Sequence, residues 1–240
     1  MRVAALARGL GLATLIGIAG CAYQGGGVAN PLTRRATWFS FVAGNDIRAA
    51  CTPGAPDHFR MIYNGLWTEQ VRIYELGAAG PRRLDERIIG QPTVDDFSLT
   101  DPLAPWRGDG GSVTLTDNQY DALLHQLDIS DAYHSPTSTL TLRADAFYWV
   151  AATCHEGVFH LTAWLYPSAA FDHASFTAWL AGIDNTGIPF NKPRPWTEVA
   201  TMAGGTGSAY ATTTAPRNLP PATSWSFGIA QDRMVDALEF

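Results

Sequence analysis

Residues 58–76, HFRMIYNGLWTEQVRIYEL, constrain the fold most strongly. Two runs rich in aromatic and β-branched residues flank Asn64 and Gly65, and an Asn-Gly pair in this setting is typical of a two-residue type I′ hairpin turn. Counting outward from that turn places Arg60 opposite Glu69, and opposite charges that face each other across a hairpin favour the register. The segment therefore predicts an antiparallel β-hairpin.

The flanking segments predict further strands and two helices. Thr116 and Gln119 form a capping box before an apolar stripe, which predicts a helix over residues 117–128. Asp172 is expected to cap a second helix over residues 173–183. Strands are expected at residues 37–44, 82–90, 138–154 and 157–167, with a hairpin turn at 154–157 and a loop at 91–114.

This order of elements predicts an α+β fold. Runs of strands alternate with single helices, and few connections are long enough for parallel crossovers. We expect a mainly antiparallel sheet, built of meanders and hairpins, with two helices packed on one face. An incomplete β-sandwich is the alternative.

The first twenty residues have the pattern of a secretory signal. Residues 1–8 carry two arginines and no acid, and residues 9–20 are small and apolar. This apolar run is shorter than the ~20 residues that a membrane-spanning helix needs. It ends in the motif IAGC at Cys21, which resembles the lipobox of bacterial lipoproteins. The resemblance implies that signal peptidase II cleaves before Cys21 and that this cysteine carries the lipid.

The resemblance also implies a location. Ala22, rather than Asp, follows the lipobox cysteine, as in lipoproteins sorted to the outer membrane. We therefore expect a chain that is lipid-anchored in the bacterial cell envelope, in the outer membrane facing the periplasm. Residues 59–76 resemble uncharacterised proteobacterial envelope lipoproteins, a likeness that implies no activity.

Composition divides the chain into four segments. We expect residues 1–20 to be a cleaved signal peptide and residues 21–35 a lipidated flexible tether, because it carries three consecutive glycines and Pro31, which discourages helix. Residues 36–192 are expected to be the globular domain. Residues 193–240 are expected to be an arm rich in Pro, Gly and Thr that ends in a short helix.

The two cysteines beyond Cys21 predict a disulfide. Cys51 and Cys154 form an even pair in a compartment that is oxidising if the chain is exported. The alternative is a reactive thiol at Cys154 beside His155. Neighbouring residues on a strand point to opposite faces, so this adjacency does not place the imidazole on the sulfur.

Charge excludes some classes of partner. Loss of the two arginines of the signal leaves 14 basic against 22 acidic residues, a formal net charge of −8. Such a chain, without a basic stripe, does not have the charge pattern of a nucleic-acid-binding protein. It is equally unsuited to docking on anionic lipids through charge.

The sequence carries no specific catalytic or metal-binding motif. His155 and His160 are five residues apart in a predicted hairpin, so they do not present the helical ligand pair of a zinc protease. A nucleophile elbow and a phosphate-binding loop are both missing from the sequence. We expect no metal and no cofactor. The acidic pairs at residues 85–86 and 95–96 suit a glycosidase only if their separation in space is right.

Aromatic and basic residues on the strands suggest a surface for binding. Alternation along strands sends some of them to the solvent side, and the candidate binding face comprises Arg60, Trp67, Arg72 and Tyr74. We therefore expect a non-enzymatic binding or assembly module that engages an envelope protein or a glycan. A lipid-anchored periplasmic hydrolase acting on glycan or peptide is the alternative.

Overall fold

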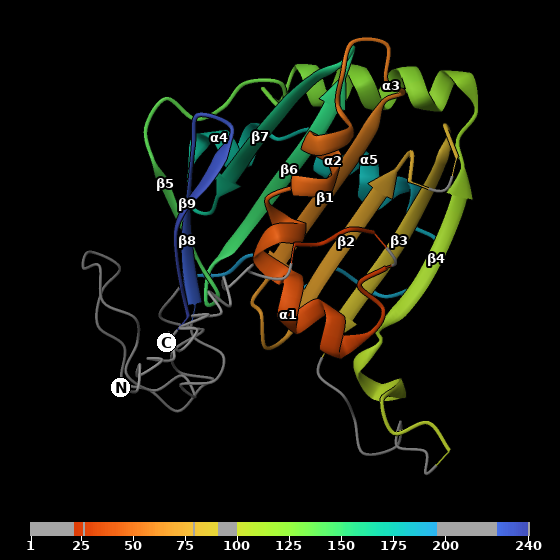
Figure 1. Ribbon diagram of the computed structural model, residues 1–240, viewed down its shortest axis with the longest axis vertical. Helices are drawn as coiled ribbons and strands as arrows, with labels where there is room; N and C mark the ends of the chain where they lie inside the picture. The colour runs from red at the N-terminus through yellow and green to blue at the C-terminus, as the bar shows by residue number, and fades with distance from the viewer. Residues whose placement is uncertain (1–21, 26, 79, 91–99, 196–224, 240) are drawn as a thin grey trace, which may run out of the picture.

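The computed structural model describes residues 22–25, 27–78, 80–90, 100–195 and 225–239 (Figure 1). The α+β class is confirmed. A six-stranded antiparallel sheet has the strand order β4-β3-β2-β1-β6-β7, and a small sheet has the order β5-β8-β9. The bounds are α1 Pro31–Val42, α2 Asn45–Ala50, β1 His58–Gly65, β2 Gln70–Leu76, β3 Arg83–Gly90, η2 Ala104–Trp106, β4 Asp109–Thr114, α3 Asp117–Asp128, β5 Leu140–Arg143, β6 Phe147–His155, β7 Val158–Leu165, α4 Ala169–His173, α5 Phe176–Ile183, β8 Trp225–Ala230 and β9 Arg233–Glu239.

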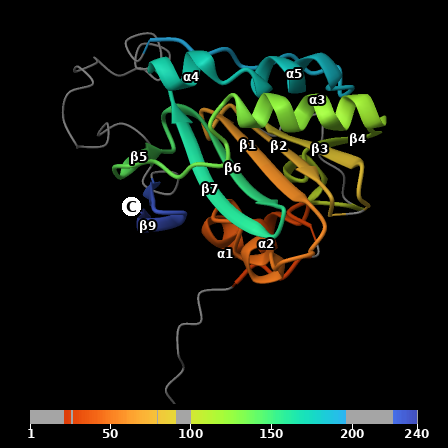
Figure 2. The ribbon, with the colours of Figure 1, turned by 90° about the horizontal axis from the view of Figure 1, so that it is seen from above.

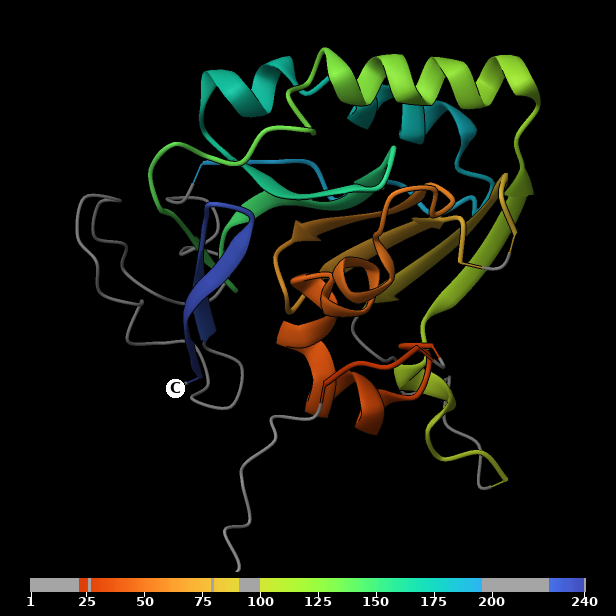
Figure 3. The ribbon, with the colours of Figure 1, turned by 45° about the horizontal axis from the view of Figure 1, so that its top comes forward.

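Helices cover both faces of the large sheet (Figures 2 and 3). The two helices expected from the sequence, α3 and α5, share one face, as predicted. Their buried residues Leu123, Leu127, Phe176 and Leu180 pack with Phe59, Met61 and Tyr63 of β1. The other face carries α1, α2 and the small sheet, where Trp38, Phe41, Ile47 and Phe227 pack with Ile62 and Ile73.

The β1–β2 hairpin forms, but its predicted turn is wrong. Asn64 pairs with Val71 inside the ladder, and residues 66–69 make the turn. The Asn64 side-chain amide donates to the carbonyls of Ala144 and Ala146, at 3.1 and 2.6 Å, which holds this residue within the sheet. Arg60 consequently lies opposite Glu75 rather than Glu69.

Helix α1 replaces the strand expected at residues 37–44. The Asn30 side chain accepts hydrogen bonds from two backbone N–H groups of the first turn. Pro31 occupies the first helical position, where its missing N–H costs no hydrogen bond, so it begins the helix rather than preventing it. Trp38 and Phe41, three residues apart, both lie on the buried side.

Folded structure extends into the segment predicted as a tether. Tyr23 and Val28 are each only 5% exposed. The Tyr23 N–H donates to Ser40 Oγ at 3.0 Å, and its ring meets Phe41 edge-on at 4.8 Å. The packed domain therefore already includes Tyr23, ahead of the expected boundary at residue 36.

The chain end forms a hairpin instead of the expected short helix. Strands β8 and β9 pair, and Trp225, Phe227 and Ile229 alternate toward the core. β8 also pairs with β5, a strand about 85 residues earlier in the chain. This long-range pairing is not visible in the local sequence, so the local pattern did not predict strands here. Most of the expected arm, residues 196–224, lies outside the described residues.

Three local predictions have clear outcomes. The capping box of α3 is confirmed, because Thr116 and Gln119 each accept from the other's backbone N–H. The expected Asp172 cap is wrong: Ser168 caps α4, which contains Asp172, and α5 begins at Phe176. Strand β4 occupies part of the predicted loop, whose residues 91–99 lie outside the described chain.

The predicted disulfide is confirmed. Cys51 and Cys154 are bonded, with a Cα–Cα distance of 5.6 Å. The bond ties the end of α2 to the end of β6, so it fixes α2 against the large sheet. Of the helices described, none has both the length and the apolar character to cross a membrane.

Candidate functional site: a polar cleft on the large sheet

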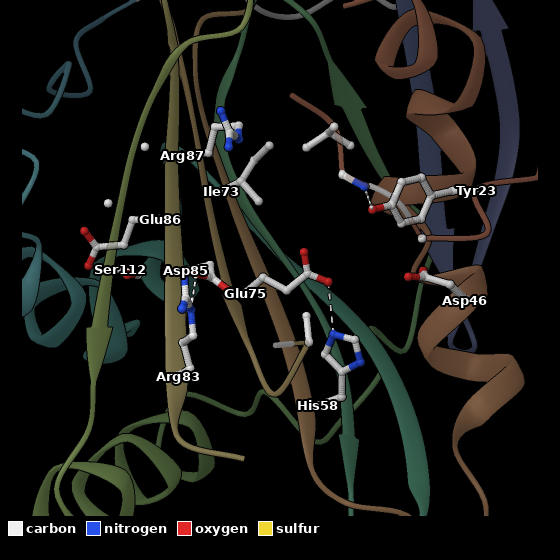
Figure 4. A pocket seen from close by; sticks show the side chains of 16 residues that line it. Tyr23, Asp46, His58, Ile73, Glu75, Arg83, Asp85, Glu86, Arg87 and Ser112 are labelled. Carbon is white, nitrogen blue, oxygen red and sulfur yellow. Dashed lines mark hydrogen bonds and ion pairs between the residues drawn. The ribbon is translucent and has the colours of Figure 1, made fainter. Parts of the chain in front are cut away.

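A cleft of about 760 Å³ opens on the sheet face that carries α1 and α2 (Figure 4). Its floor is formed by β2, β3 and β4, and its opposite wall by α2 and the segment that precedes α1. It is lined by Tyr23, Gly25, Gly27, Val28, Asp46, His58, Ile73, Glu75, Ala78, Arg83, Asp85, Glu86, Arg87, Gly110, Gly111 and Ser112.

The strand register aligns polar side chains across the floor. Arg60 pairs with Glu75, Glu75 with Asp85, and Asp85 with Ser112, on four adjacent strands. Directly paired residues of antiparallel strands point to the same face, so these four side chains form one row. In the next row on the same face, Ile73 pairs with Arg87 and Arg87 with Gly110. Because Gly110 has no side chain, nothing projects from β4 into the cleft at this position.

Arg60, at the β1 end of this row, is buried below the cleft and joins its floor to the wall formed by α2. Its side chain is fully buried and forms a two-pronged contact with Asp46 of α2, at 2.8 and 2.7 Å. The same guanidinium donates to Glu75 Oε1 at 2.6 Å and to the Phe41 carbonyl at 2.9 Å. It also lies 3.8 Å from the centre of the Phe41 ring and 5.2 Å from that of Tyr23.

These contacts keep the groups of the floor charged. Burial alone disfavours the Arg60 cation, but its hydrogen bond to Asp46 and the charge of Glu75 outweigh burial and raise the pKa of Arg60. Burial likewise acts to raise the pKa of Glu75, but the hydrogen bond from His58, at 3.0 Å, and the charge of Arg60 lower it below its ordinary value.

The outer part of the cleft carries a second, more exposed ion pair. Arg83 Nε donates to Asp85 Oδ1 at 2.7 Å, and both side chains are at least one third exposed. Arg87 donates to the Arg107 carbonyl at 3.2 Å. The cleft thus presents hydrogen-bond donors and acceptors side by side, with most of its charges already balanced within the protein.

The hydroxyls of the cleft are poorly placed for nucleophilic catalysis. Tyr23 Oη accepts from the Gly27 N–H at 3.1 Å, and burial raises its pKa. Within the described residues, no hydrogen bond joins the Ser112 hydroxyl to His58, whose ring is held by Glu75. The lowered pKa of Glu75 is also the opposite of what a general acid at neutral pH needs.

The four residues of the predicted binding face do not share a surface. Arg60 lies under the cleft, but Arg72 and Tyr74 point to the other side of the sheet, because alternate residues of a strand face opposite ways. Trp67 lies in the β1–β2 turn and packs on Trp38 and Trp225, with ring centres 4.8 and 5.4 Å away. The predicted face is therefore wrong, and only Arg60 belongs to the cleft region.

Arg72 and Tyr74 instead fasten the segment after α5 to the opposite face. Arg72 Nη1 and the Tyr74 hydroxyl both donate to Asp184 Oδ2, at 2.6 and 2.5 Å. Burial opposes the charge of Asp184, but hydrogen bonds from Thr186 and Tyr74 lower its pKa. Arg72 also donates to the Ile188 carbonyl.

Glu86 projects toward the same segment. It is 3% exposed, and its Oε2 accepts from the Asn185 N–H at 3.3 Å. Its Oε1 is buried without a hydrogen-bond partner in the described structure. Burial, with the nearby charge of Asp184, raises the pKa of Glu86 to about 7. Asp85 and Glu86 therefore face opposite ways and do not form a carboxylate pair.

A further polar cluster lies beside the disulfide. Asp57 accepts from the Tyr120 hydroxyl at 2.5 Å and from the Glu156 N–H at 3.2 Å. It also contacts His155 Nδ1 at 3.0 Å. Asp57 thereby ties the chain before β1 to α3 and to the β6–β7 turn. With Cys154 in the disulfide and His155 on Asp57, these two neighbours do not form a thiol–imidazole pair.

The remaining sequence candidates have mixed outcomes. His160 lies 3.5 Å from Asp232, away from His155's partner Asp57. No group of three His, Cys, Asp or Glu side chains suited to a metal ion occurs among the described residues. Cys21 and the acidic pair at residues 95–96 lie outside the described residues.

The sequence did not point to Asp46, His58, Glu75 and Ser112 as site residues, because their proximity depends on the strand register and on the position of α2.

Comparison of the chain with known proteins identified no relative. The chain matches no protein-family model, no curated protein and no solved structure.

Proposed function

We propose that this chain is a non-enzymatic binding module of the bacterial envelope, held at the membrane by a lipid on Cys21, and that its polar cleft binds a hydroxyl-rich ligand such as an envelope glycan. The observation that carries the proposal is the row formed by Glu75, Asp85 and Ser112 across the cleft floor, with the buried Arg60 at its β1 end. Arg60 and His58 hold Glu75, Arg83 holds Asp85, and these carboxylates and the Ser112 hydroxyl line a concave surface.

The chemistry of the cleft favours an uncharged polar ligand. Arg60 is shared by Asp46 and Glu75, and Arg83 is paired with Asp85, so neither sign of charge dominates. Hydroxyl groups both donate and accept hydrogen bonds, which matches a surface where carboxylates lie beside arginines. A volume of about 760 Å³ also lies within the range of small-molecule sites.

Two features support the envelope location. The lipobox motif at Cys21 follows a short apolar run of the signal type. The disulfide between Cys51 and Cys154 suits a chain that folds in an oxidising compartment, because such bonds are rare in the reducing cytosol.

The anchor is tested by a Cys21→Ser substitution in the full chain. We expect the unchanged protein in the membrane fraction and the Cys21→Ser protein in the soluble fraction. If the variant stays with the membranes at the wild-type level, lipidation at Cys21 is refuted.

The cleft is tested by calorimetric titration of the soluble Cys21→Ser protein with digalactosyl glycerol, an uncharged sugar head group. Ser112 is exposed on β4 and lines the cleft, so Ser112→Tyr should fill the cleft without disturbing the core and weaken binding at least tenfold. Thr114→Tyr, on the same strand but outside the cleft, is the matched control. Equal binding by both variants would place the ligand elsewhere, and release of free galactose would favour the hydrolase alternative.

A further inference from the structure

The chain next to the lipid-bearing position forms one wall of the cleft. Tyr23, Gly25, Gly27 and Val28 all line it. Tyr23 is fixed in place, because its N–H donates to Ser40 Oγ and the residue is only 5% exposed. The wall is therefore part of the folded domain.

Chain geometry limits the distance between the anchor and this wall. Cys21 is two residues before Tyr23, and two residues of fully extended chain span at most about 7 Å. The polar head-group layer of one leaflet is roughly 5–7 Å deep, taken as half the difference between the whole bilayer and its hydrocarbon core. A lipid on Cys21 thus keeps Tyr23 at the level of the head groups or just above them.

Two exposed apolar side chains flank the same wall. The buried Arg34 guanidinium donates to the Val28 carbonyl, at 2.9 Å, and to the Trp106 carbonyl, at 2.5 Å, so it joins this segment to η2. Trp106 is 36% exposed, and Leu32, in the first turn of α1, is 67% exposed. Tryptophan is enriched at membrane interfaces, where an amphipathic ring suits the head-group level.

We propose that the cleft lies against the surface of the anchoring membrane and takes its ligand as the hydroxyl-rich head group of a lipid in that membrane. The inference rests on the proposed lipid at Cys21 and on binding in the cleft. The new element is the source of the ligand, which is the bilayer. A lipid head group is favoured over a soluble glycan because Tyr23, in the cleft wall, is only two residues from Cys21.

The orientation is tested by fluorescence quenching of the lipidated full chain in vesicles that contain lipids brominated near the head group. The protein has eight tryptophans, so the contribution of Trp106 is the difference between the wild type and Trp106→Phe. We expect Trp106→Phe to lose most of the quenchable signal. Trp179→Phe, on α5 across the sheet, is the matched control and should retain it. Equal quenching of both variants, with the protein bound to the vesicles, would overturn the orientation but leave the anchor intact.

The ligand source is tested with vesicles of phosphatidylethanolamine with or without digalactosyl diacylglycerol. For the lipidated chain, we expect the glycolipid to protect the amide hydrogens of β3 and β4 from exchange at least threefold more strongly than plain vesicles. Ser112→Tyr should abolish this difference, and Thr114→Tyr should keep it. An insertion of about twelve Gly and Ser residues after Ala22, which spans roughly 20 Å on average, should also reduce it.

The outcomes separate the two proposals. If soluble Cys21→Ser protein binds digalactosyl glycerol but the lipidated chain shows no glycolipid-dependent protection, the membrane-presented ligand is refuted and the binding cleft stands. If the long insertion leaves the protection unchanged, close apposition to the bilayer is refuted. If neither form of the sugar binds, the proposed hydroxyl-rich ligand fails as well.

Discussion

Two fully buried arginines, Arg60 and Arg72, lie on neighbouring strands of one sheet but serve opposite faces. Each is held by aspartate, and each stacks on a phenylalanine ring 3.8 Å away. Their surroundings differ. The Asp184 side chain that pairs with Arg72 is 4% exposed, whereas those of Asp46 and Glu75, which pair with Arg60, are each 17% exposed.

This difference separates a structural ion pair from one that borders a site. On the Arg72 side, the segment after α5 covers the charges, and the pair fastens that segment to the sheet. On the Arg60 side, α2 and the segment around Tyr23 leave the carboxylates open to the cleft. The same chemistry therefore fixes the fold on one face and orients hydrogen-bonding groups on the other.

Replacing the two arginines in turn gives the largest expected effect. Arg72→Met should lower the free energy of unfolding by roughly 3–5 kcal/mol, because it leaves Asp184 buried without its charged partner. Arg60→Met should cost less, about 2–3 kcal/mol, because water in the cleft can solvate Asp46 and Glu75. Urea denaturation of both variants measures the difference. An equal or larger loss for Arg60→Met would contradict the comparison.

Removing the disulfide should affect the two faces unequally. The double variant Cys51→Ser, Cys154→Ser should lose roughly 2–5 kcal/mol, because the bond closes a long loop in the unfolded chain. Since α2 carries Asp46 and ends at Cys51, we also expect exchange protection to fall more around Arg60 than around Arg72. A uniform loss across both faces, measured by hydrogen exchange, would argue against this local role.

The buried Glu86 gives the covered face a pH dependence. Its pKa in the folded protein, about 7, is above its ordinary value of 4.5, so the folded state binds this proton more tightly than the unfolded state. Its contribution to stability is therefore complete below pH 4.5 and is lost as the pH rises through about 7. Glu86→Gln should raise stability at pH 8 by up to roughly 3 kcal/mol and change it little at pH 4.

Thermal unfolding across this pH range measures the effect of Glu86. Glu69→Gln, at a more exposed carboxylate that pairs with Arg194, is the control and should not reproduce the gain. A gain from Glu86→Gln that is equal at both pH values would mean that the ionisation of this group does not limit stability.

The smallest effect on stability is expected at the outer edge of the cleft. Arg83 and Asp85 form an exposed ion pair, and such pairs contribute at most about 1 kcal/mol. Arg83→Ala should therefore change the free energy of unfolding by less than about 0.5 kcal/mol. If the cleft binds digalactosyl glycerol, the same variant should weaken that binding. If binding of digalactosyl glycerol is unchanged, Arg83 is not part of the binding site.

Local sequence signals predicted much of the fold. The capping box of α3 requires only Thr116 and Gln119, and it forms as expected. The antiparallel pairing around residues 58–76, the strand at 83–90 and the pairing of Cys51 with Cys154 were also readable. The first three features depend on residues that are close in sequence. The disulfide follows from the cysteine count, because assigning Cys21 to the lipobox leaves a single pair.

The hairpin register and the candidate site depended on distant contacts. Arg60 meets an opposite charge at Glu69 in the predicted register and at Glu75 in the observed one, so charge alone did not decide between them. The Asn64 side chain, bonded to the backbone at Ala144 and Ala146, holds the register observed. That register pairs Arg60 with Glu75. The separate registers of β2 with β3 and of β3 with β4 align Glu75 with Asp85 and Ser112 on the cleft floor.

The sequence by itself determined the fold class, the disulfide pair and the cap of α3, because these follow from the order of the elements, the cysteine count and local hydrogen bonding. Tertiary structure decided which face each strand residue occupies, that residues 37–44 belong to a helix, and that the chain end forms strands. The physical reason is that aromatic runs such as TWFSF bury equally well as helix or strand. Only the neighbours that cover them, here Phe227 and Trp67 from distant parts of the chain, select one form.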